Sequence, residues 1–232
     1  MPSSQMTTIS NGQFDIYVSL RPGAGKQPAL IICSEAFGVN SHMRGVADRF
    51  AEQGFAVFVP ELFWRIERHV ALPYDEAGLK RASELADAYD KQKGVDDMAK
   101  VVSIIRDRND VTGKIGILGF CVGGAAAYLA AARLGLDACV SYYGKGIEDY
   151  LADAVTLTCP TVLHYGGSDR FIPPATIAKV REGLKARPDV EIYDYPGVDH
   201  GFNSEDRRAY NADVAGLAMT RTMAVLDRGL RP

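Results

Sequence analysis

The segment at residues 114–124, KIGILGFCVGG, constrains the fold more than any other stretch of this chain. The apolar residues before Gly119 are typical of a buried strand, and the small residues 125–132 are typical of a helix. Between them, Gly-x-Cys-x-Gly around Cys121 predicts a sharp turn in which a flanking Cβ would clash with the nearby backbone. Such a turn raises the Cys121 thiol above the sheet edge, at a helix N-terminus whose dipole favours a thiolate.

The composition is that of one globular domain, which we expect to span residues 1–232. The chain has 232 residues, of which 47% are hydrophobic, and this is enough for one well-packed core. Its net charge of -3 gives no reason to expect a nucleic acid or an anionic membrane as partner. The sequence MPSSQMTTIS lacks the basic start and apolar stretch of a signal peptide, and no uncharged run is long enough to span a bilayer.

The four cysteines are widely spaced and form no Cys-x-x-Cys pair. Three of them, Cys33, Cys139 and Cys159, lie in or beside apolar, strand-like runs. This pattern predicts reduced thiols in a cytoplasmic protein, with neither a disulfide framework nor a zinc site. We therefore expect no bound metal.

Hydrophobic patterning predicts strands that alternate with helices along the whole chain. The expected strands are 13–20 (an antiparallel edge strand), 29–33, 55–59, 114–120, 138–142, 161–165 and 191–195. The expected helices are 41–53, 75–89, 96–108, 125–132, 173–185 and 204–226, the last one capped by Ser204. Such alternation indicates an α/β class with a mostly parallel sheet covered by helices on both faces. We expect the long irregular segment 61–93 to cap a site at the strand ends.

Ligands bind beyond the carboxyl ends of the strands in such sheets, and four chemically distinctive residues are predicted at these ends: Glu35, Cys121, Asp169 and His200. The order Cys121, Asp169, His200 is the nucleophile–acid–histidine order of α/β-hydrolases. His200 would accept the thiol proton and later protonate the leaving group, while Asp169 would fix the imidazole tautomer. The alternatives are a structural cysteine, a surface histidine and a turn aspartate, and the turn together with the order favours catalysis over them.

Three further assignments follow from this constellation. The backbone N–H groups of Val122 and Ala36 are the expected oxyanion hole, one after the nucleophile and one in the loop after residue 33. Glu35, a carboxylate at a strand end, is either used in catalysis or paired with an arginine such as Arg44, and the residues alone leave both interpretations open. Asp194 and Asp199 are rival acids, although neither is well placed in sequence to reach the imidazole.

The quoted residues resemble the dienelactone hydrolase family over nearly the whole chain. The resemblance is carried by the segment 119–124 (GFCVGG), by 35–38 (EAFG), by 94–97 (GVDD), and by Asp169 and 200–202 (HGF). It implies an α/β-hydrolase fold, a Cys-His-Asp triad and no cofactor, with activity on a lactone. It also implies that Glu35 helps to generate the thiolate when substrate arrives.

The chain departs from this family where the substrate carboxylate is bound. The family holds that carboxylate with two arginines, but here Ser204 stands four residues past His200 and Leu79 stands at the other position. Arg81 and Arg207 are the nearest replacements, and each is otherwise an ordinary surface charge. We assign substrate contacts to Phe37, Arg81, Ser204 and Arg207.

The sequence therefore predicts a thiol-dependent hydrolase of small esters or lactones, with a small-molecule substrate and no obligate protein partner. The resemblance does not determine which ester or lactone. Two other classes stay open: a redox protein that reacts through Cys121, and a non-catalytic binding module on the same scaffold. No resolving cysteine lies near Cys121 in sequence, which counts against the first, and the intact triad order counts against the second.

Overall fold

The fold is built on one eight-stranded sheet, seen in a computed structural model that describes residues 1–8 and 13–231. The strand order is β1-β2-β4-β3-β5-β6-β7-β8. The strands are β1 (Ser3–Thr8), β2 (Asp15–Leu20), β3 (Gln27–Cys33), β4 (Ala56–Pro60), β5 (Val111–Phe120), β6 (Ala138–Tyr142), β7 (Thr161–Gly166) and β8 (Val190–Tyr195). Strands β3 to β8 run parallel to one another. Strand β2 is antiparallel to β4, and β1 is antiparallel to β2. The predicted α/β architecture is confirmed.

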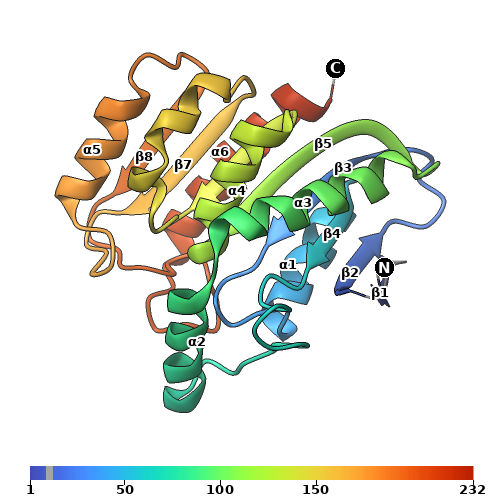
Figure 1. Ribbon diagram of the computed structural model, residues 1–232, viewed down its shortest axis with the longest axis horizontal. Coiled ribbons are helices and arrows are strands. Elements are labelled where there is room, and N and C mark those ends of the chain that lie inside the picture. Colours follow the sequence, from blue (N-terminus) through green and yellow to red (C-terminus); the bar gives the residue numbers. More distant parts are fainter. Residues whose placement is uncertain (9–12, 232) are drawn as a thin grey trace.

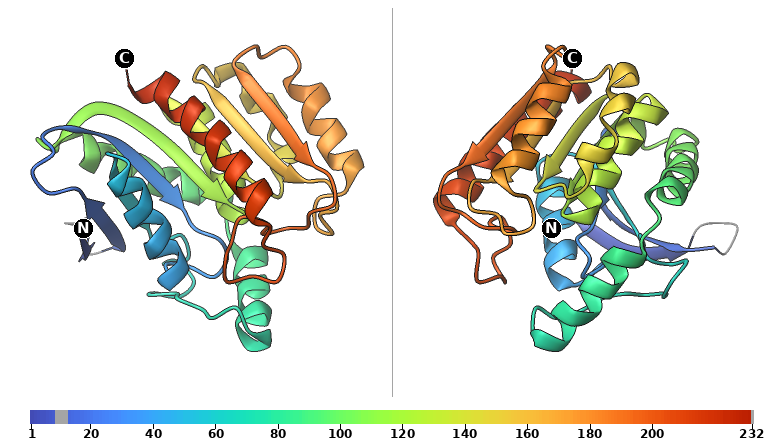
Figure 2. Two further views of the ribbon diagram at one scale, coloured as in Figure 1. Left: turned by 180° about the vertical axis from the view of Figure 1, so that it is seen from behind. Right: turned by 60° about the vertical axis from the view of Figure 1, so that its left-hand side comes forward.

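Helices cover both faces of this sheet. They are α1 (Ser41–Glu52), α2 (Glu76–Ala88), α3 (Lys91–Arg106), α4 (Val122–Leu134), α5 (Pro174–Leu184) and α6 (Ala212–Leu230), with short 3-10 helices η1 (Ile147–Asp149) and η2 (Leu151–Thr156). Helices α3, α4 and α5 lie in front of the sheet in Figure 1, and α1 and α6 lie on the other face, which Figure 2 shows from behind. Helix α2 extends away from the sheet (Figure 1), within the segment predicted to form a cap.

Helix α4 packs closely on the sheet because its first turn has no side chains in the way. A Cβ on Gly119 would overlap the Gly123 carbonyl, and a Cβ on Gly123 would overlap the carbonyl oxygens of Cys33 and Ser34. Residues 122–132 of α4 are all buried, so this helix is enclosed on every side. The close approach required by the sequence pattern is therefore present at both glycines.

The structure corrects three predicted elements. The strand predicted at 13–20 is antiparallel but is not the edge, because β1 pairs along its outer side. Helix α3 begins earlier than predicted, with Asp90 as its N-cap, and Asp97 faces inward to bind Trp64 and Arg65. Helix α6 is capped by Asn211, whose side chain accepts from the Val214 N–H, and not by Ser204. The short, polar β1 gave no apolar alternation by which it could be found.

Candidate active site

Cys121 lies at the junction of β5 and α4 in a strained backbone conformation. Its φ of 57° is in the left-handed region, which costs a residue with a Cβ on the order of 1–3 kcal/mol. The turn is held by the Cys121 N–H, which donates to the Tyr142 carbonyl at 3.0 Å, and by the Gly124 N–H, which donates to the Cys121 carbonyl. The side chain is partly exposed. The predicted turn is therefore present, with the thiol beside the first residue of a helix.

His200 and Asp169 form a buried hydrogen-bonded pair. The His200 Nδ1 lies 2.7 Å from the Asp169 Oδ2, and both side chains are almost fully buried. The other carboxylate oxygen of Asp169 accepts from the N–H groups of Phe171 and Ile172, at 2.7 and 3.1 Å. These contacts orient the carboxylate toward the imidazole, which fixes the ring tautomer.

The two rival acids are committed elsewhere. Asp194 pairs with Arg181, and Asp199 pairs with Arg170 at 3.1 Å. The Asp199 side chain also accepts from the His200 backbone N–H at 2.7 Å, so it supports the loop and not the ring. Among the three aspartates, Asp169 is the one that the structure brings to the imidazole.

The electrostatic environment of His200 favours its protonated form. Burial lowers the pKa of the imidazole, but the charge at Cys121 and the hydrogen bonds with Asp169 and Cys121 outweigh it and raise the pKa to about 10. A histidine with such a pKa is an imidazolium at neutral pH. A protonated imidazole that is hydrogen-bonded to a carboxylate and lies beside a thiol favours the thiolate form of that thiol.

Glu35 follows β3 and is the centre of a second buried network. Its carboxylate accepts from the Tyr143 hydroxyl at 3.1 Å and from the Tyr74 hydroxyl at 3.2 Å, and it pairs with Arg207 at 3.3 Å. The Glu35 side chain is 2% exposed and that of Arg207 is 13% exposed. The partner of Glu35 is therefore Arg207 and not Arg44, whose Nε donates to the Val39 carbonyl.

The tyrosines Tyr74 and Tyr143 were not predicted from the sequence. Tyr143 directly follows β6, its φ is 40°, and its ring packs on the His200 ring with a centroid distance of 4.8 Å. Burial and the nearby Glu35 raise the pKa of its hydroxyl well above the usual range, so the group stays a donor. Its place one residue past a strand, at the carboxyl edge of the sheet, was the available signal.

A cavity of about 640 Å³ joins these groups. Its lining includes Glu35, Cys121, His200 and Arg207, and helix α2 supplies one wall, as expected for a cap. Ala36 and Phe37 line the cavity as well, and Val122 is the first residue of α4, where an N–H has no acceptor within the helix. Of the side chains assigned to catalysis, Glu35, Cys121 and His200 thus line one cavity together with Ala36, whereas Asp169 is not a lining residue.

The structure separates the two proposed replacements for the family's arginines, Arg81 and Arg207, and shows where Ser204 lies. Arg207 lines the cavity, although it lies in the loop before α6 and not in a helix. Arg81 does not line it, because its guanidinium pairs with Glu67 and Glu84. Ser204 is fully buried and is likewise not a lining residue. Ser204 and Arg81 are therefore poorly placed to contact a substrate.

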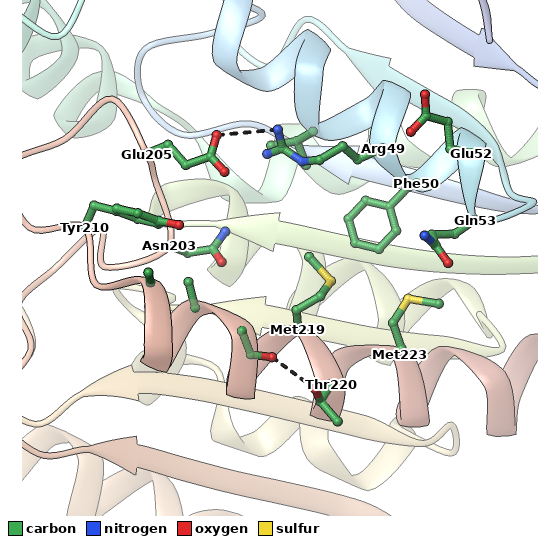
Figure 3. Close-up of a pocket in the computed structure, with 14 residues that line it drawn as sticks. Arg49, Phe50, Glu52, Gln53, Asn203, Glu205, Tyr210, Met219, Thr220 and Met223 are labelled. Carbon is green, nitrogen blue, oxygen red and sulfur yellow. Dashed lines mark hydrogen bonds and ion pairs between the residues drawn. The ribbon is translucent and has the colours of Figure 1, made fainter. Parts of the chain in front are cut away.

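A second hollow of about 690 Å³ lies between α1 and α6, shown in Figure 3. Phe50, Met219 and Met223 form its apolar part, and the ion pair of Arg49 with Glu205 lies at one end (Figure 3). It contains no nucleophile–histidine pair. The chemistry therefore assigns the active site to the cavity at Cys121, although the two hollows are of similar size.

The remaining histidines and cysteines are structural. His164 is buried in β7, where its ring nitrogens lie 2.9 Å from the Tyr195 hydroxyl and 3.1 Å from the Thr222 hydroxyl. Burial lowers the pKa of His164 to about 3 and raises the pKa of the Cys33 thiol to about 12, so both stay neutral. No disulfide forms among the described residues, where Cys139 and Cys159 are also buried and free.

One group of possible metal ligands occurs among the described residues, away from the cavity: Asp15, Glu61 and His69. The guanidinium of Arg68 already pairs with both carboxylates, at 3.5 Å and 3.0 Å. One of the two negative charges that would attract a cation is therefore already compensated by an arginine.

The chain is similar to known proteins over most of its length. The model of the "Dienelactone hydrolase family" matches residues 14–230. A carboxymethylenebutenolidase of Pseudomonas putida is 34% identical over 206 residues, which cover 88% of this chain and 87% of that protein. Another, of Pseudomonas sp. strain P51, is 29% identical and covers 94% of this chain and 91% of its own length.

Solved structures share the fold along nearly the full length. A Klebsiella pneumoniae protein described as a "Putative Dienelactone Hydrolase" superimposes with a TM-score of 0.86 at 29% identity, covering 98% of this chain and 99% of that one. A dienelactone hydrolase of Anabaena variabilis has the same fold, with a TM-score of 0.72 at 19% identity and 99% coverage of both chains. Within the described residues, no helix is long and apolar enough to cross a membrane. The match of the family model to residues 14–230, together with the shared fold, shows that the chain belongs to the dienelactone hydrolase family and is a hydrolase of esters or lactones.

Proposed function

We propose that this chain hydrolyses small esters or lactones through a Cys121–His200–Asp169 triad. The observation that carries the proposal is that Cys121, at a strained turn, shares a cavity with a His200 that is hydrogen-bonded to a buried Asp169. Nucleophile, base and orienting acid are the three parts that acyl transfer needs, and here they occur in the chain order of α/β-hydrolases.

The expected reaction has two steps. The Cys121 thiolate attacks the substrate carbonyl, and the negative oxygen that develops is stabilised by the N–H groups of Val122 and Ala36. Collapse of this intermediate breaks the ester bond, and the His200 imidazolium gives its proton to the leaving alkoxide. Water, deprotonated by the now neutral His200, then hydrolyses the thioester and returns the thiolate–imidazolium pair.

Glu35 and Arg207 extend the proposal to substrate binding. A substrate carboxylate that enters the cavity would compete with Glu35 for the guanidinium of Arg207, which lines the same cavity as Cys121. The family resemblance implies that Glu35, released from that pair, helps to generate the thiolate, a role that applies to molecules in which Cys121 still carries its proton. The relatives named carboxymethylenebutenolidases act on a lactone of this kind, so we propose dienelactone as a candidate substrate with neutral aryl esters beside it.

The proposal is tested by trapping the acyl enzyme. After mixing with 4-nitrophenyl butyrate, intact-mass spectrometry and peptide mapping should find one butyryl group on Cys121. Cys121→Ala should lose the adduct and the activity while keeping the fold, and Cys121→Ser should keep little activity because a serine hydroxyl stays protonated. Cys159→Ala is the matched control, since this buried thiol should be irrelevant.

Each of the rival classes has its own outcome. An oxidised Cys121 with no acyl adduct would indicate the redox class, and an unchanged thiol with no turnover would indicate a binding module. Activity near the wild-type level in Cys121→Ala would contradict the proposed nucleophile.

A further inference from the structure

Lys145 is a cavity residue that the reaction described above does not use. It lies in the loop after β6, two residues past Tyr143, and its exposed side chain lines the cavity that holds Cys121. The loop is fixed in place, because a Cβ on the preceding Gly144 would meet the Ser141 hydroxyl and Ile147. The backbone therefore directs an ammonium group to the mouth of the cavity from the body of the protein.

The cations around this cavity differ in what they already bind. Arg207 is paired with Glu35, as described above. Lys80 comes from α2, which also contributes Glu76, Glu84 and Asp87 to the lining, but Glu84 is bound by Arg81 and Lys80 forms no ion pair within the described residues. Lys145 likewise forms no ion pair there, and it differs from Lys80 in lying over Phe171, on the His200 side of the cavity. It is a charge available to a ligand.

Lys145 is joined to the catalytic histidine through one aromatic ring. Its Nζ lies 5.8 Å from the centroid of the Phe171 ring, and that ring meets the His200 ring edge-on at 5.1 Å. Phe171 is 45% exposed and lines the cavity, and the Arg170 guanidinium also lies over its ring, 5.5 Å from the centroid. Its backbone is held, because its N–H donates to the Asp169 carboxylate at 2.7 Å.

This geometry defines a subsite on the side of the leaving group. His200 gives its proton to the departing oxygen, so the part of the substrate attached to that oxygen lies next to His200 and along Phe171. A flat apolar group would pack on the exposed part of the Phe171 ring. Lys145 lies on the far side of that ring from His200. An anionic substituent at the far end of such a leaving group would reach the ammonium.

We propose that Lys145 is a specificity-determining residue that binds an anionic group on the leaving alcohol, separated from the scissile oxygen by about one aromatic ring. The inference rests on the proposed function and deepens it. The substrate class is an ester of a hydroxy acid whose carboxylate lies beyond a flat, apolar spacer. The contact between Lys145 and the anionic group is equally strong in the enzyme–substrate complex and in the transition state. It therefore lowers KM and leaves kcat unchanged.

The test compares two substrates that differ in charge alone. 4-Acetoxybenzoate has a carboxylate on the leaving group, and 4-acetoxybenzamide has a neutral group of the same shape and the same acyl part. Exposed ion pairs change affinity by up to about fivefold. Lys145→Gln should therefore reduce the preference for the anionic ester about three- to fivefold, through KM, and Lys145→Glu should reduce it about tenfold. The preference of the wild type should also fall between 20 mM and 500 mM NaCl, because added salt screens the pair.

Lys80→Gln is the matched control, since it removes a lysine from the wall that α2 forms. It should leave the preference for the anionic ester unchanged. If Lys80→Gln removes the preference while Lys145→Glu does not, the anion is bound on α2 and the proposal is wrong. If both Lys145 variants slow the hydrolysis of the two esters to the same extent, Lys145 has a structural role, for example by attracting acids of α2. That result would also show that the proposal is wrong.

A readout without turnover separates this proposal from the proposed function. Isothermal titration calorimetry measures the binding of 4-hydroxybenzoate and 4-hydroxybenzamide, the two leaving alcohols, to the intact chain. Loss of the carboxylate preference in Lys145→Glu supports the subsite even if neither acetate ester is hydrolysed, in which case the proposed function alone fails. Equal binding of the two alcohols by the wild type would overturn the subsite even if both esters are hydrolysed.

Discussion

Replacing Arg207 by methionine is the most informative perturbation of the buried network, because methionine keeps much of the side-chain volume and removes the charge. Glu35 would then be a carboxylate 2% exposed with no cation beside it. Leaving one member of a buried ion pair unpartnered costs about 3–5 kcal/mol. The hydroxyls of Tyr74 and Tyr143 still donate to Glu35, so we expect the lower end, about 3 kcal/mol.

A loss of this size is readily measured. For a chain of this length, 1 kcal/mol shifts the melting temperature by about 2–4 °C, so Arg207→Met should melt about 6–12 °C below the wild type. Urea unfolding, followed by circular dichroism, gives the same quantity as a change in the free energy of unfolding. Arg170→Met is the control, because its pair with Asp199 is exposed and should be worth less than about 1 kcal/mol.

The double variant decides whether the loss comes from Glu35. Glu35→Gln removes the charge left behind, so Arg207→Met with Glu35→Gln should recover most of the 3 kcal/mol, and the double-mutant cycle should show strong coupling. A loss below about 1 kcal/mol in Arg207→Met, or losses that add in the double variant, would refute this reasoning. In that case the tyrosine hydroxyls alone would be sufficient to hold the buried carboxylate.

Two further predictions concern the pH dependence of the thiol and the turn that holds it. The pKa of His200 is raised to about 10, above about 6.5 in an unfolded chain, so the imidazolium stabilises the fold fully below about pH 6.5 and loses that contribution as the pH rises through about 10. His200→Gln should slow the alkylation of Cys121 by iodoacetamide at neutral pH and change the pH dependence of that rate, because the substitution removes the cation beside the thiol. Gly123→Ala should lower the free energy of unfolding by more than about 4 kcal/mol or prevent folding, because the new Cβ overlaps two backbone carbonyls. The control is Gly216→Ala in the exposed part of α6, which should raise the free energy of unfolding by up to about 1 kcal/mol. Equal urea midpoints for the two alanine variants would show that the close approach at Gly123 is not required.

The local elements of the fold and of the site were readable from the sequence because each is encoded by neighbouring residues. Gly119, Gly123 and the apolar residues before them predict a strand, a turn and a helix from one short segment, although the contact that requires Gly123 is with the distant carbonyls of residues 33 and 34. The order of Cys121, Asp169 and His200 predicted which side chains belong together, because consecutive parallel strands all end at one edge of the sheet. The Asp169–His200 contact at 2.7 Å agrees with that order.

The tertiary structure decided everything that depends on which distant side chains meet. Glu35 and Arg207 are 172 residues apart, and neither the choice of Arg207 over Arg44 nor the contributions of Tyr74 and Tyr143 could be derived from spacing. Arg81 has the right charge and lies on the right helix, but two nearby acids bind it, and only coordinates show which way a side chain on a cap helix points. Short-range sequence patterns fix backbone geometry, because sterics and hydrogen bonding act between neighbours. Ion pairs and cavities depend on how the whole sheet brings separate loops together.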